Sequence, residues 1–402
     1  MAPRETVERV RPLAASMGVT RVANVTGLDT LGIPVVAVYR PNARSLVVSQ
    51  GKGLDLWAAK ASGLMEAIEG FHAEHAELPL RLASARELAR AHELVDLAGL
   101  PRVSTGSFHV DRQILWCEGR DFGSDRPLWV PYELVHTSFV LPLPAGSGYF
   151  TMSSNGLASG NHVLEAVSHG LCEVIERDAL ALWDAAGGSG ATRGRIDPGS
   201  VDDPDCARVL AAMQGADLEI GIWDITSDVG VATFACVLVD RGPGDTGQVY
   251  TSHGSGCHPS RAIALLRALT EAAQTRLTFI AGTRDDADRE FFERARDPAR
   301  IARLRAELDA PGEGRSFGAV PSREAPDFED DVRWLRERLA AAGLAQIAVV
   351  DLTQPRFGIP VVRVIVPGLE SLHGIPGYVP GARARALRER LRAGDAPSGA
   401  PA

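Results

Sequence analysis

A repeated acidic pattern inside apolar helical stretches is the feature that most constrains this chain. Gly63-Leu64-Met65-Glu66-Ala67-Ile68-Glu69 and Gly170-Leu171-Cys172-Glu173-Val174-Ile175-Glu176 share the pattern G-L-x-E-x-I-E, and Ala268-Leu269-Thr270-Glu271-Ala272-Ala273-Gln274 is a weaker third copy. Side chains three or four positions apart share one face of a helix. A single acidic turn of this kind is most often solvent-exposed. Three acids at the same phase of an apolar stripe instead indicate one site where the helices converge.

Carboxylates gathered in one place need cations between them, because like charges repel each other. Mg2+ takes oxygen ligands and usually keeps substrate phosphates as partners. The repeat therefore predicts a site for a magnesium-bound nucleotide, with glutamates as its floor.

Composition excludes several other classes of protein. Hydrophobic residues make up 45% and charged residues 23% of the 402 positions, as in ordinary globular proteins. The net charge of -9 argues against a nucleic-acid surface. The cysteines form no CxxC pair, so neither a zinc site nor a disulfide framework is indicated. No apolar run approaches the ~20 residues of a spanning helix, and the charged N-terminal residues do not resemble a signal peptide, so we expect a cytoplasmic protein without a membrane segment.

Glycine-rich segments precede all three acidic helices. A strand over Ser45–Ser49 leads into Gly51-Lys52-Gly53 before a helix over Leu56–Glu74. Polar glycine loops are expected over 154–161 and 252–259, before helices that start near Val163 and over Arg261–Thr278. Glycines let backbone N–H groups approach a phosphate, and a lysine adds a point charge. The Walker A pattern is absent.

The remaining elements suggest one intertwined domain. Gly32-Ile33-Pro34-Val35-Val36 and Gly358-Ile359-Pro360-Val361-Val362 predict equivalent strands, in one sheet or in two related halves. A helix is expected over 83–97. We expect a single domain over residues 1–392 and a disordered tail over 393–402, which has no apolar pattern.

Five segments of the chain together resemble the YcaO-domain family. They are Ser49–Gly53, Ala61–Glu69, Ser154–Asn161, Glu173–Asp178 and Arg267–Arg276, and the resemblance extends over residues 20–370. It implies an α+β YcaO-type fold, in which mixed sheets and helices with repeated acidic motifs surround a central nucleotide site. It also implies ATP-dependent activation of a peptide backbone amide by phosphorylation of its oxygen. A nucleophile then replaces that oxygen and gives an azoline, a thioamide or an amidine.

The resemblance also assigns roles to individual residues. The Mg2+ ligands it implies are Glu66, Glu69, Glu165, Glu173, Glu176 and Glu271. The ATP-binding residues it implies are Lys52, Ser62, Asn155, Asn161, Glu165, Arg177, Arg267, Gln274 and Arg276. Arg177, Glu176 and Lys52 are the expected catalytic residues, because phosphoryl transfer depends on positioning and on charge stabilisation.

Two features separate the chain from typical azoline-forming members. The sequence ends without a Pro-x-Pro-x-Pro tail, and the stretches Gly358–Glu370 and Pro380-Gly381-Ala382-Arg383-Ala384 resemble members that act beside a TfuA-like protein. We therefore expect thioamide formation on a ribosomally synthesised peptide or a protein, with a TfuA-like partner. The alternatives are an azoline-forming cyclodehydratase, a macrocyclic amidine-forming enzyme, or a non-catalytic nucleotide-binding accessory protein in sulfur modification. The apolar N-terminal strands are compatible with a homodimer.

Overall fold

The structure, a computed structural model, describes residues 1–190, 194–242, 251–310 and 314–393. It contains two compact units, each assembled from separate stretches of chain. Unit 1 comprises Met1–Asn42, Leu46–Ala67 and Gly187–Glu324, and unit 2 comprises Ala43–Ser45, Ile68–Ala186 and Ala325–Ala402. The predicted single domain stays a prediction, and all but the first residue of the predicted tail lies outside the described residues.

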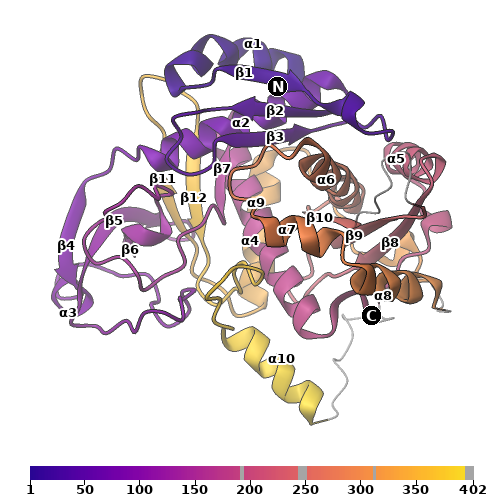
Figure 1. Ribbon diagram of the computed structural model, residues 1–402. Coiled ribbons are helices and arrows are strands. Elements are labelled where there is room, and N and C mark those ends of the chain that lie inside the picture. The colour runs from indigo at the N-terminus through magenta and orange to yellow at the C-terminus, as the bar shows by residue number, and fades with distance from the viewer. Residues whose placement is uncertain (191–193, 243–250, 311–313, 394–402) are drawn as a thin grey trace. The chain divides into compact units, whose positions relative to one another are not determined.

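Unit 1 holds two three-stranded antiparallel sheets, which Figure 1 labels. The first has the order β1 (Arg21–Asn24), β2 (Val35–Tyr39) and β3 (Val48–Lys52). The second has the order β10 (Thr251–Cys257), β9 (Thr233–Asp240) and β8 (Leu218–Asp224). The helices of this unit are α1 (Pro3–Ala14), the first part of α2 (Leu56–Glu74), α5 (Pro204–Gly215), α6 (Arg261–Ala281), α7 (Arg289–Ala295) and α8 (Pro298–Asp309).

Helix α6 joins the two sheets of unit 1 through its apolar faces. Leu265 and Leu269 belong to the core formed with α5, β8 and β9, whereas Leu277 packs with Val35 and Val48 of the first sheet. Both cores consist of fully or nearly fully buried side chains. Because α6 carries the third acidic motif, its packing fixes that motif relative to β3 and β10.

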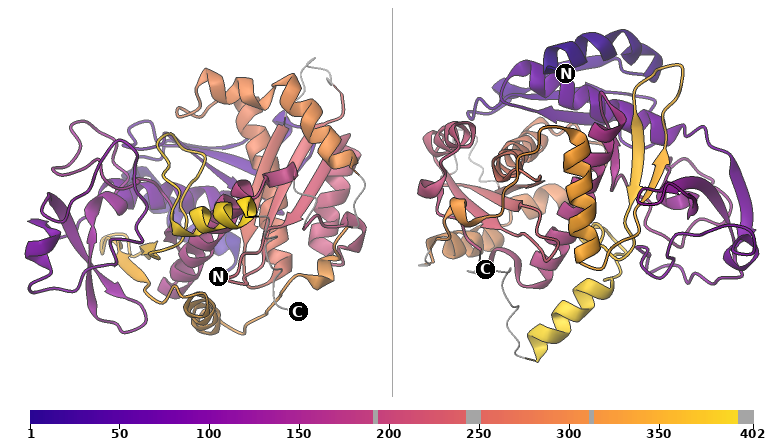
Figure 2. Two further views of the ribbon diagram at one scale, coloured as in Figure 1. Left: turned by 90° about the horizontal axis from the view of Figure 1, so that it is seen from below. Right: turned by 180° about the vertical axis from the view of Figure 1, so that it is seen from behind.

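Unit 2 is built on a six-stranded sheet. Its strands are β4 (Leu80–Ser84), β5 (Gln113–Asp121), β11 (Ala348–Asp351), β12 (Val361–Ile365) and β7 (Leu157–Ser159), with β6 (Pro127–Pro131) paired to β5. Helix α4 (Val163–Ala185) packs on β12 and β7, and α9 (Phe328–Ala341) and α10 (Ala382–Arg392) pack on α4 (Figure 2). The short helix α3 (Ala85–Leu88) follows β4 directly.

Small residues let each acidic helix approach its strand closely. A Cβ atom on Gly51 of β3 would lie 2.1 Å from the backbone nitrogen of Gly63 in α2. A Cβ atom on Gly170 of α4 would lie 3.2 Å from the carbonyl oxygen of Gly156 and 2.7 Å from Val364. On β10, a Cβ atom on Gly254 would lie 2.3 Å from the backbone of α6. The first residue of each acidic repeat is therefore a packing position.

The repeated G-I-P-V-V motif leads into an interior strand of two different sheets. Gly32 and Gly358 both have positive φ angles, of 66° and 62°, and β2 and β12 start directly after the prolines. Val36 of β2 lies opposite Gly51 of β3, and Val362 of β12 lies opposite Ala158 of β7. The two strands lie in different sheets, one in each unit, so they do not share one sheet, and the relation between two halves of the chain stays a prediction.

Four local predictions were wrong. The loop expected over 154–161 contains strand β7, which pairs with β12. Residues 251–257 form strand β10 instead of a loop, because its glycines fit against the backbone of α6. The strand expected over Ser45–Ser49 is shifted to Val48–Lys52, so Lys52 is the last residue of β3. The helix expected over 83–97 is limited to α3, because the backbone of Val95 and of Glu93 bonds to Trp129 on β6.

Within the described part of the chain, no helix has both the length and the apolar character that crossing a membrane requires.

Candidate functional site

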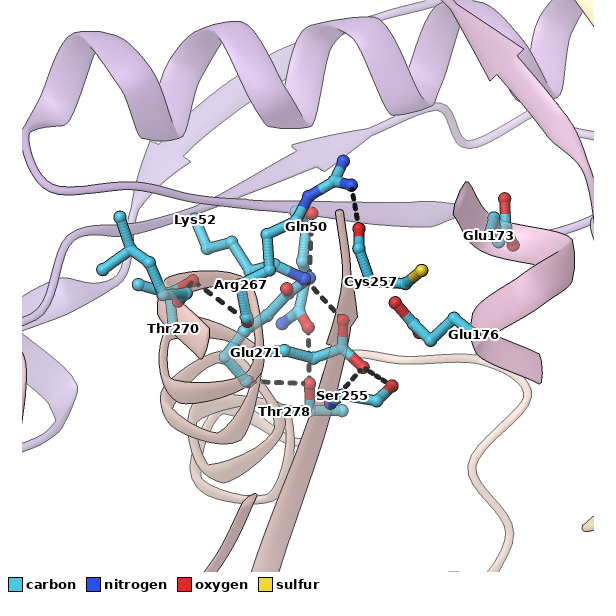
Figure 3. A network of polar contacts seen from close by, with 12 residues as sticks. Gln50, Lys52, Glu173, Glu176, Ser255, Cys257, Arg267, Thr270, Glu271 and Thr278 are labelled. Carbon is cyan, nitrogen blue, oxygen red and sulfur yellow. Dashed lines mark hydrogen bonds and ion pairs between the residues drawn. The ribbon is translucent and has the colours of Figure 1, made fainter. Parts of the chain in front are cut away.

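In unit 1 a lysine and a glutamate meet between β3 and α6. Lys52 Nζ donates to Glu271 Oε2 at 2.7 Å, and both side chains are about three-quarters buried (Figure 3). The other carboxylate oxygen of Glu271 accepts from the backbone N–H and the hydroxyl of Ser255 on β10, at 3.4 and 3.3 Å. Strand β10 therefore orients the glutamate and strand β3 supplies its cation.

Glu66 lies in the electrostatic field of this pair. Its pKa is raised to about 7, mainly because the surrounding protein reduces hydration of the carboxylate, while Lys52 and Arg284 oppose the rise and Glu271 adds to it. The side chain keeps exposed surface, so water still reaches it. Glu66 is therefore a solvent-accessible carboxyl group surrounded by protein. A nearby cation would lower its pKa and so favour its ionised form.

The other predicted residues of unit 1 have distinct surroundings. Arg267 donates to the carbonyl of Cys257 at 3.2 Å, and Gln274 donates to the carbonyl of Gln50 at 2.9 Å. Arg276 forms ion pairs with Asp29 and Asp240, at 2.8 and 2.5 Å. Ser62 lies one turn before Glu66 on α2. Of these four residues, Arg276 is the one held by two carboxylates, and its predicted contact with nucleotide stays a prediction.

In unit 2 a serine orients a glutamate as in unit 1. Glu69 Oε1 accepts from the backbone N–H of Ser159 on β7 at 2.9 Å and from its hydroxyl at 2.7 Å. Ser159 and Ser255 thus make the same two bonds to one carboxylate oxygen, from two different strands. Such bonds fix the direction in which a carboxylate can accept a metal ion.

Helix α4 carries the second acidic pair together with its own cation. Arg177 lies 3.9 Å from Glu173 and 3.5 Å from Glu176, so its guanidinium bridges the two acids. Glu176 is 8% exposed and Glu173 half-buried. The repulsion that the sequence predicts between these carboxylates is therefore reduced by a neighbour on the same helix.

The segment before α4 and the first turn of α4 hold the remaining predicted residues. The backbone N–H of Asn161 donates to Glu165 Oε2 at 2.8 Å, which ties Glu165 to the start of the helix. Asn155 Oδ1 is buried, and no hydrogen-bond partner for it occurs among the described residues. A buried amide oxygen without a donor is a position that a ligand or metal ion can satisfy.

Sequence reasoning missed Arg363, which interacts electrostatically with two acids of unit 2, Glu173 and Glu69. It is completely buried on β12 and donates to the carbonyls of Asn155 at 2.8 Å and Val135 at 2.9 Å. Burial lowers its pKa to about 10, although Glu173 and Glu69 favour the charged form, so the guanidinium stays charged at neutral pH. An isolated arginine in the Val361–Ile365 strand was the available signal, since buried arginines need acidic or carbonyl partners.

The donor set fits magnesium bound together with a nucleotide. In the stretches that the structure describes, no group of three or more His, Cys, Asp or Glu side chains could hold a metal ion alone. Mg2+ is usually held by one or two carboxylates plus substrate phosphates and water. The pair of Glu66 and Glu271 in unit 1 and the pair of Glu173 and Glu176 in unit 2 match that need. The prediction that acids of all three helices share one site stays a prediction.

The comparison with protein families identifies the class of protein. A family model described as YcaO cyclodehydratase, ATP- and Mg2+-binding, matches residues 50–370. The chain therefore belongs to the YcaO family, whose members bind ATP and Mg2+.

Two relatives match nearly the whole chain. A Rhizobium leguminosarum bv. trifolii protein, described as an uncharacterized protein in the tfuA 3′ region, is 38% identical over 374 residues, which cover 92% of this chain and 88% of that protein. A Methanothermobacter thermautotrophicus protein is 36% identical over 374 residues, covering 92% of this chain and 94% of that one.

Two solved structures share the fold. YcaO from Methanopyrus kandleri, bound with AMPPCP and Mg2+, has a TM-score of 0.73 and is 23% identical in sequence. The match covers 94% of this chain and 95% of the Methanopyrus chain. A heterocyclase in complex with substrate and cofactor has a TM-score of 0.76 and 24% identity over 92% of this chain. This chain spans about half of that heterocyclase, 52% of its length. The α+β YcaO-type fold is confirmed.

Proposed function

We propose that this protein uses ATP to activate a peptide backbone amide and that sulfide then replaces the amide oxygen to give a thioamide. The observation that carries the ATP-dependent step is the arrangement of Lys52, Glu271 and Glu66, a cation at the end of β3 and two acids, one in the middle of α6 and one on α2. The relative in the tfuA 3′ region supports the choice of sulfur chemistry.

The proposed reaction balances without an oxidant or reductant. The amide oxygen attacks the γ-phosphorus of ATP, and the bond to ADP breaks. Hydrosulfide adds to the activated carbon, the C–O bond breaks to release phosphate, and the sulfur loses its proton. The products are a thioamide, ADP and phosphate.

The residues of the chain would act by positioning and by charge. We propose that Glu66, Glu69, Glu165, Glu173, Glu176 and Glu271 provide the ligands of Mg2+. Lys52 and Arg177 would neutralise charge on the transferring phosphoryl group, and one preorganised interaction of this kind contributes about 3 kcal/mol to catalysis. Mg2+ supplies the remaining charge neutralisation when it is bound.

Cyclodehydration is a second candidate for this site. The family model is described as a cyclodehydratase, and a Cys, Ser or Thr side chain of the substrate would then take the place of hydrosulfide. ATP and Mg2+ play the same part in both reactions, so the nucleophile alone separates the two candidates.

The test is incubation of the protein with ATP, Mg2+, sodium sulfide and a candidate peptide, with and without a TfuA-like protein, followed by mass spectrometry. Replacement of one oxygen by sulfur supports thioamidation, whereas loss of one water supports cyclodehydration and contradicts the thioamide proposal. Glu176→Gln should abolish ATP turnover while the protein stays folded. The control Glu337→Gln changes an exposed glutamate on α9 and should have no effect. Normal turnover in Glu176→Gln would refute the assignment of Glu176.

A further inference from the structure

We propose that Asp178, Glu370 and Arg383 form a C-terminal latch that holds helix α4 in place and so positions Glu176 and Arg177 for magnesium-bound ATP. This inference rests on the proposed function, and it makes Arg383 a positioning residue. It links three parts of the sequence that the nucleotide site leaves without a role: the aspartate after Arg177, the Pro367–Glu370 turn, and the Pro380–Ala384 stretch.

The centre of the latch is a buried ion pair. Arg383 donates from Nε to Asp178 Oδ1 at 2.8 Å and from Nη2 to Oδ2 at 3.0 Å, a bidentate arrangement. The backbone N–H of Glu370 donates to the same Oδ1 at 3.0 Å. The Asp178 side chain is completely buried. Bidentate arginine–carboxylate pairs fix orientation as well as distance.

Glu370 holds the start of α10 beside this pair. Its carboxylate is 3% exposed and accepts from the Tyr378 hydroxyl at 2.7 Å and from the N–H groups of Gly381 and Ala384 at 2.7 and 2.8 Å. A carboxylate at a helix N-terminus is favoured by the helix dipole. A Cβ atom at position 381 would lie 2.6 Å from Glu370 Oε1, so the contact requires glycine there.

The latch acts on α4 from the side opposite its acids. Asp178 follows Glu176 by two positions and Glu173 by five, so at 100° per residue it faces well away from both. It therefore does not join Glu173 and Glu176 as a ligand on their face. It fixes the rotation and position of the helix turn that carries them.

Both charges of the pair are needed in the folded state. Burial raises the pKa of Asp178, and the charge and hydrogen bonds of Arg383 oppose that rise. Removing one partner would leave an unpaired buried charge, which forces local rearrangement. Because Arg177 and Asp178 are consecutive, such a rearrangement displaces the proposed phosphate-binding residue directly.

The experiment compares the double variant Asp178→Asn/Arg383→Gln with Arg383→Lys and with the control Arg385→Gln. The double variant removes both charges together and so avoids an unpaired one. Arg385 lies on the exposed face of α10 and donates to the carbonyl of Pro380. The measurements are the affinity for a non-hydrolysable ATP analogue with Mg2+, the Mg2+ concentration for half-maximal ATP hydrolysis, and hydrogen exchange over residues 172–180.

We expect the double variant to bind the analogue and Mg2+ about tenfold more weakly or worse, because displacements near 1 Å have large effects on positioned groups. Exchange over residues 172–180 should accelerate, Arg383→Lys should be intermediate, and Arg385→Gln should match the wild type. A double variant that unfolds more easily but binds the analogue and Mg2+ normally would overturn the latch. If the wild type itself did not bind the analogue, the nucleotide site of the proposed function would be refuted instead.

Discussion

At the scale of single residues, the serines on β7 and β10 explain how the glutamates are prepared for a metal ion. Ser159 and Ser255 each place two hydrogen bonds on one carboxylate oxygen, of Glu69 and Glu271 respectively. These bonds restrict the rotamers of the acids when the chain folds, so less order has to be gained when a ligand binds. The acids and their serines come from segments about 90 and 16 residues apart, and spacing along the helix gives no sign of the pairing.

His136 gives a prediction for stability against pH. It is 1% exposed and stacks on Tyr132 at 4.6 Å, and its Nδ1 accepts from the N–H of Ser138. Burial, and then the charge of Arg363, lower its pKa to about 4. The unfolded chain takes up its proton near pH 6.5, so the free energy of unfolding should fall as pH drops from 6.5 to 4, by about 3 kcal/mol from this residue.

The measurement is urea unfolding at several pH values between 4 and 8. His136→Gln should lower stability at pH 8 but flatten the slope between pH 6.5 and 4. The control His109→Gln changes an exposed histidine and should leave the slope as in the wild type. An equally steep slope in His136→Gln would assign the acid sensitivity to other groups.

At the scale of elements, three strand–helix pairs use small residues to bring an acidic helix close to a strand. In α2 and α4 the glycine stands on the helix, at Gly63 and Gly170, whereas α6 has Ala268 there and β10 supplies Gly254. At α2 the strand contributes a glycine as well, Gly51 of β3, so α6 differs from α2 in having a glycine on the strand side alone. With Gly254 on the strand side, the third repeat accommodates alanine as its first residue.

Substitution of these glycines should reverse the usual effect of alanine in a helix. Glycine to alanine inside a helix normally stabilises by about 1 kcal/mol, but a Cβ on Gly170 meets Val364 and the Gly156 carbonyl. We expect Gly170→Ala to destabilise unit 2 by about 1–3 kcal/mol. Gly215→Ala, at the end of α5 with no atom within 4 Å of the added Cβ, should be neutral or stabilising. Urea unfolding checks both, and a stabilised Gly170→Ala would show that the contact relaxes at little cost.

The acidic helices were predictable from sequence, and their surroundings were not. The apolar periodicity predicts α2 with the observed bounds and the start of α6 at Arg261. These features were predictable because they depend on residues within the helix itself. Strand β10 was taken for a loop because a glycine weakens a strand unless another backbone packs closely against it, and that backbone is distant in sequence. Arg363 was missed for the same reason, since its partners are carbonyls of Val135 and Asn155.

At the scale of the whole molecule, an acidic protein has to bind an anionic nucleotide. The chain has 51 acidic and 42 basic residues, so its average field repels phosphate. Binding therefore depends on local cations such as Lys52 and Arg177 and on Mg2+ that converts acids into part of the phosphate site. Nucleotide without Mg2+ should therefore bind poorly.

The corresponding experiment measures the thermal unfolding midpoint with a non-hydrolysable ATP analogue, with Mg2+, and with both. At a hundredfold excess over the dissociation constant, a ligand of the native state stabilises by about 2.7 kcal/mol. We expect this gain only with nucleotide and Mg2+ together. Glu271→Gln in unit 1 and Glu173→Gln in unit 2 should each reduce this stabilisation, while Glu337→Gln should not.

Because the pKa of Glu66 is about 7, the stabilisation by nucleotide with Mg2+ should grow from pH 6 to pH 8 as this acid ionises. Equal stabilisation by the nucleotide without Mg2+ would contradict the role given to the glutamates.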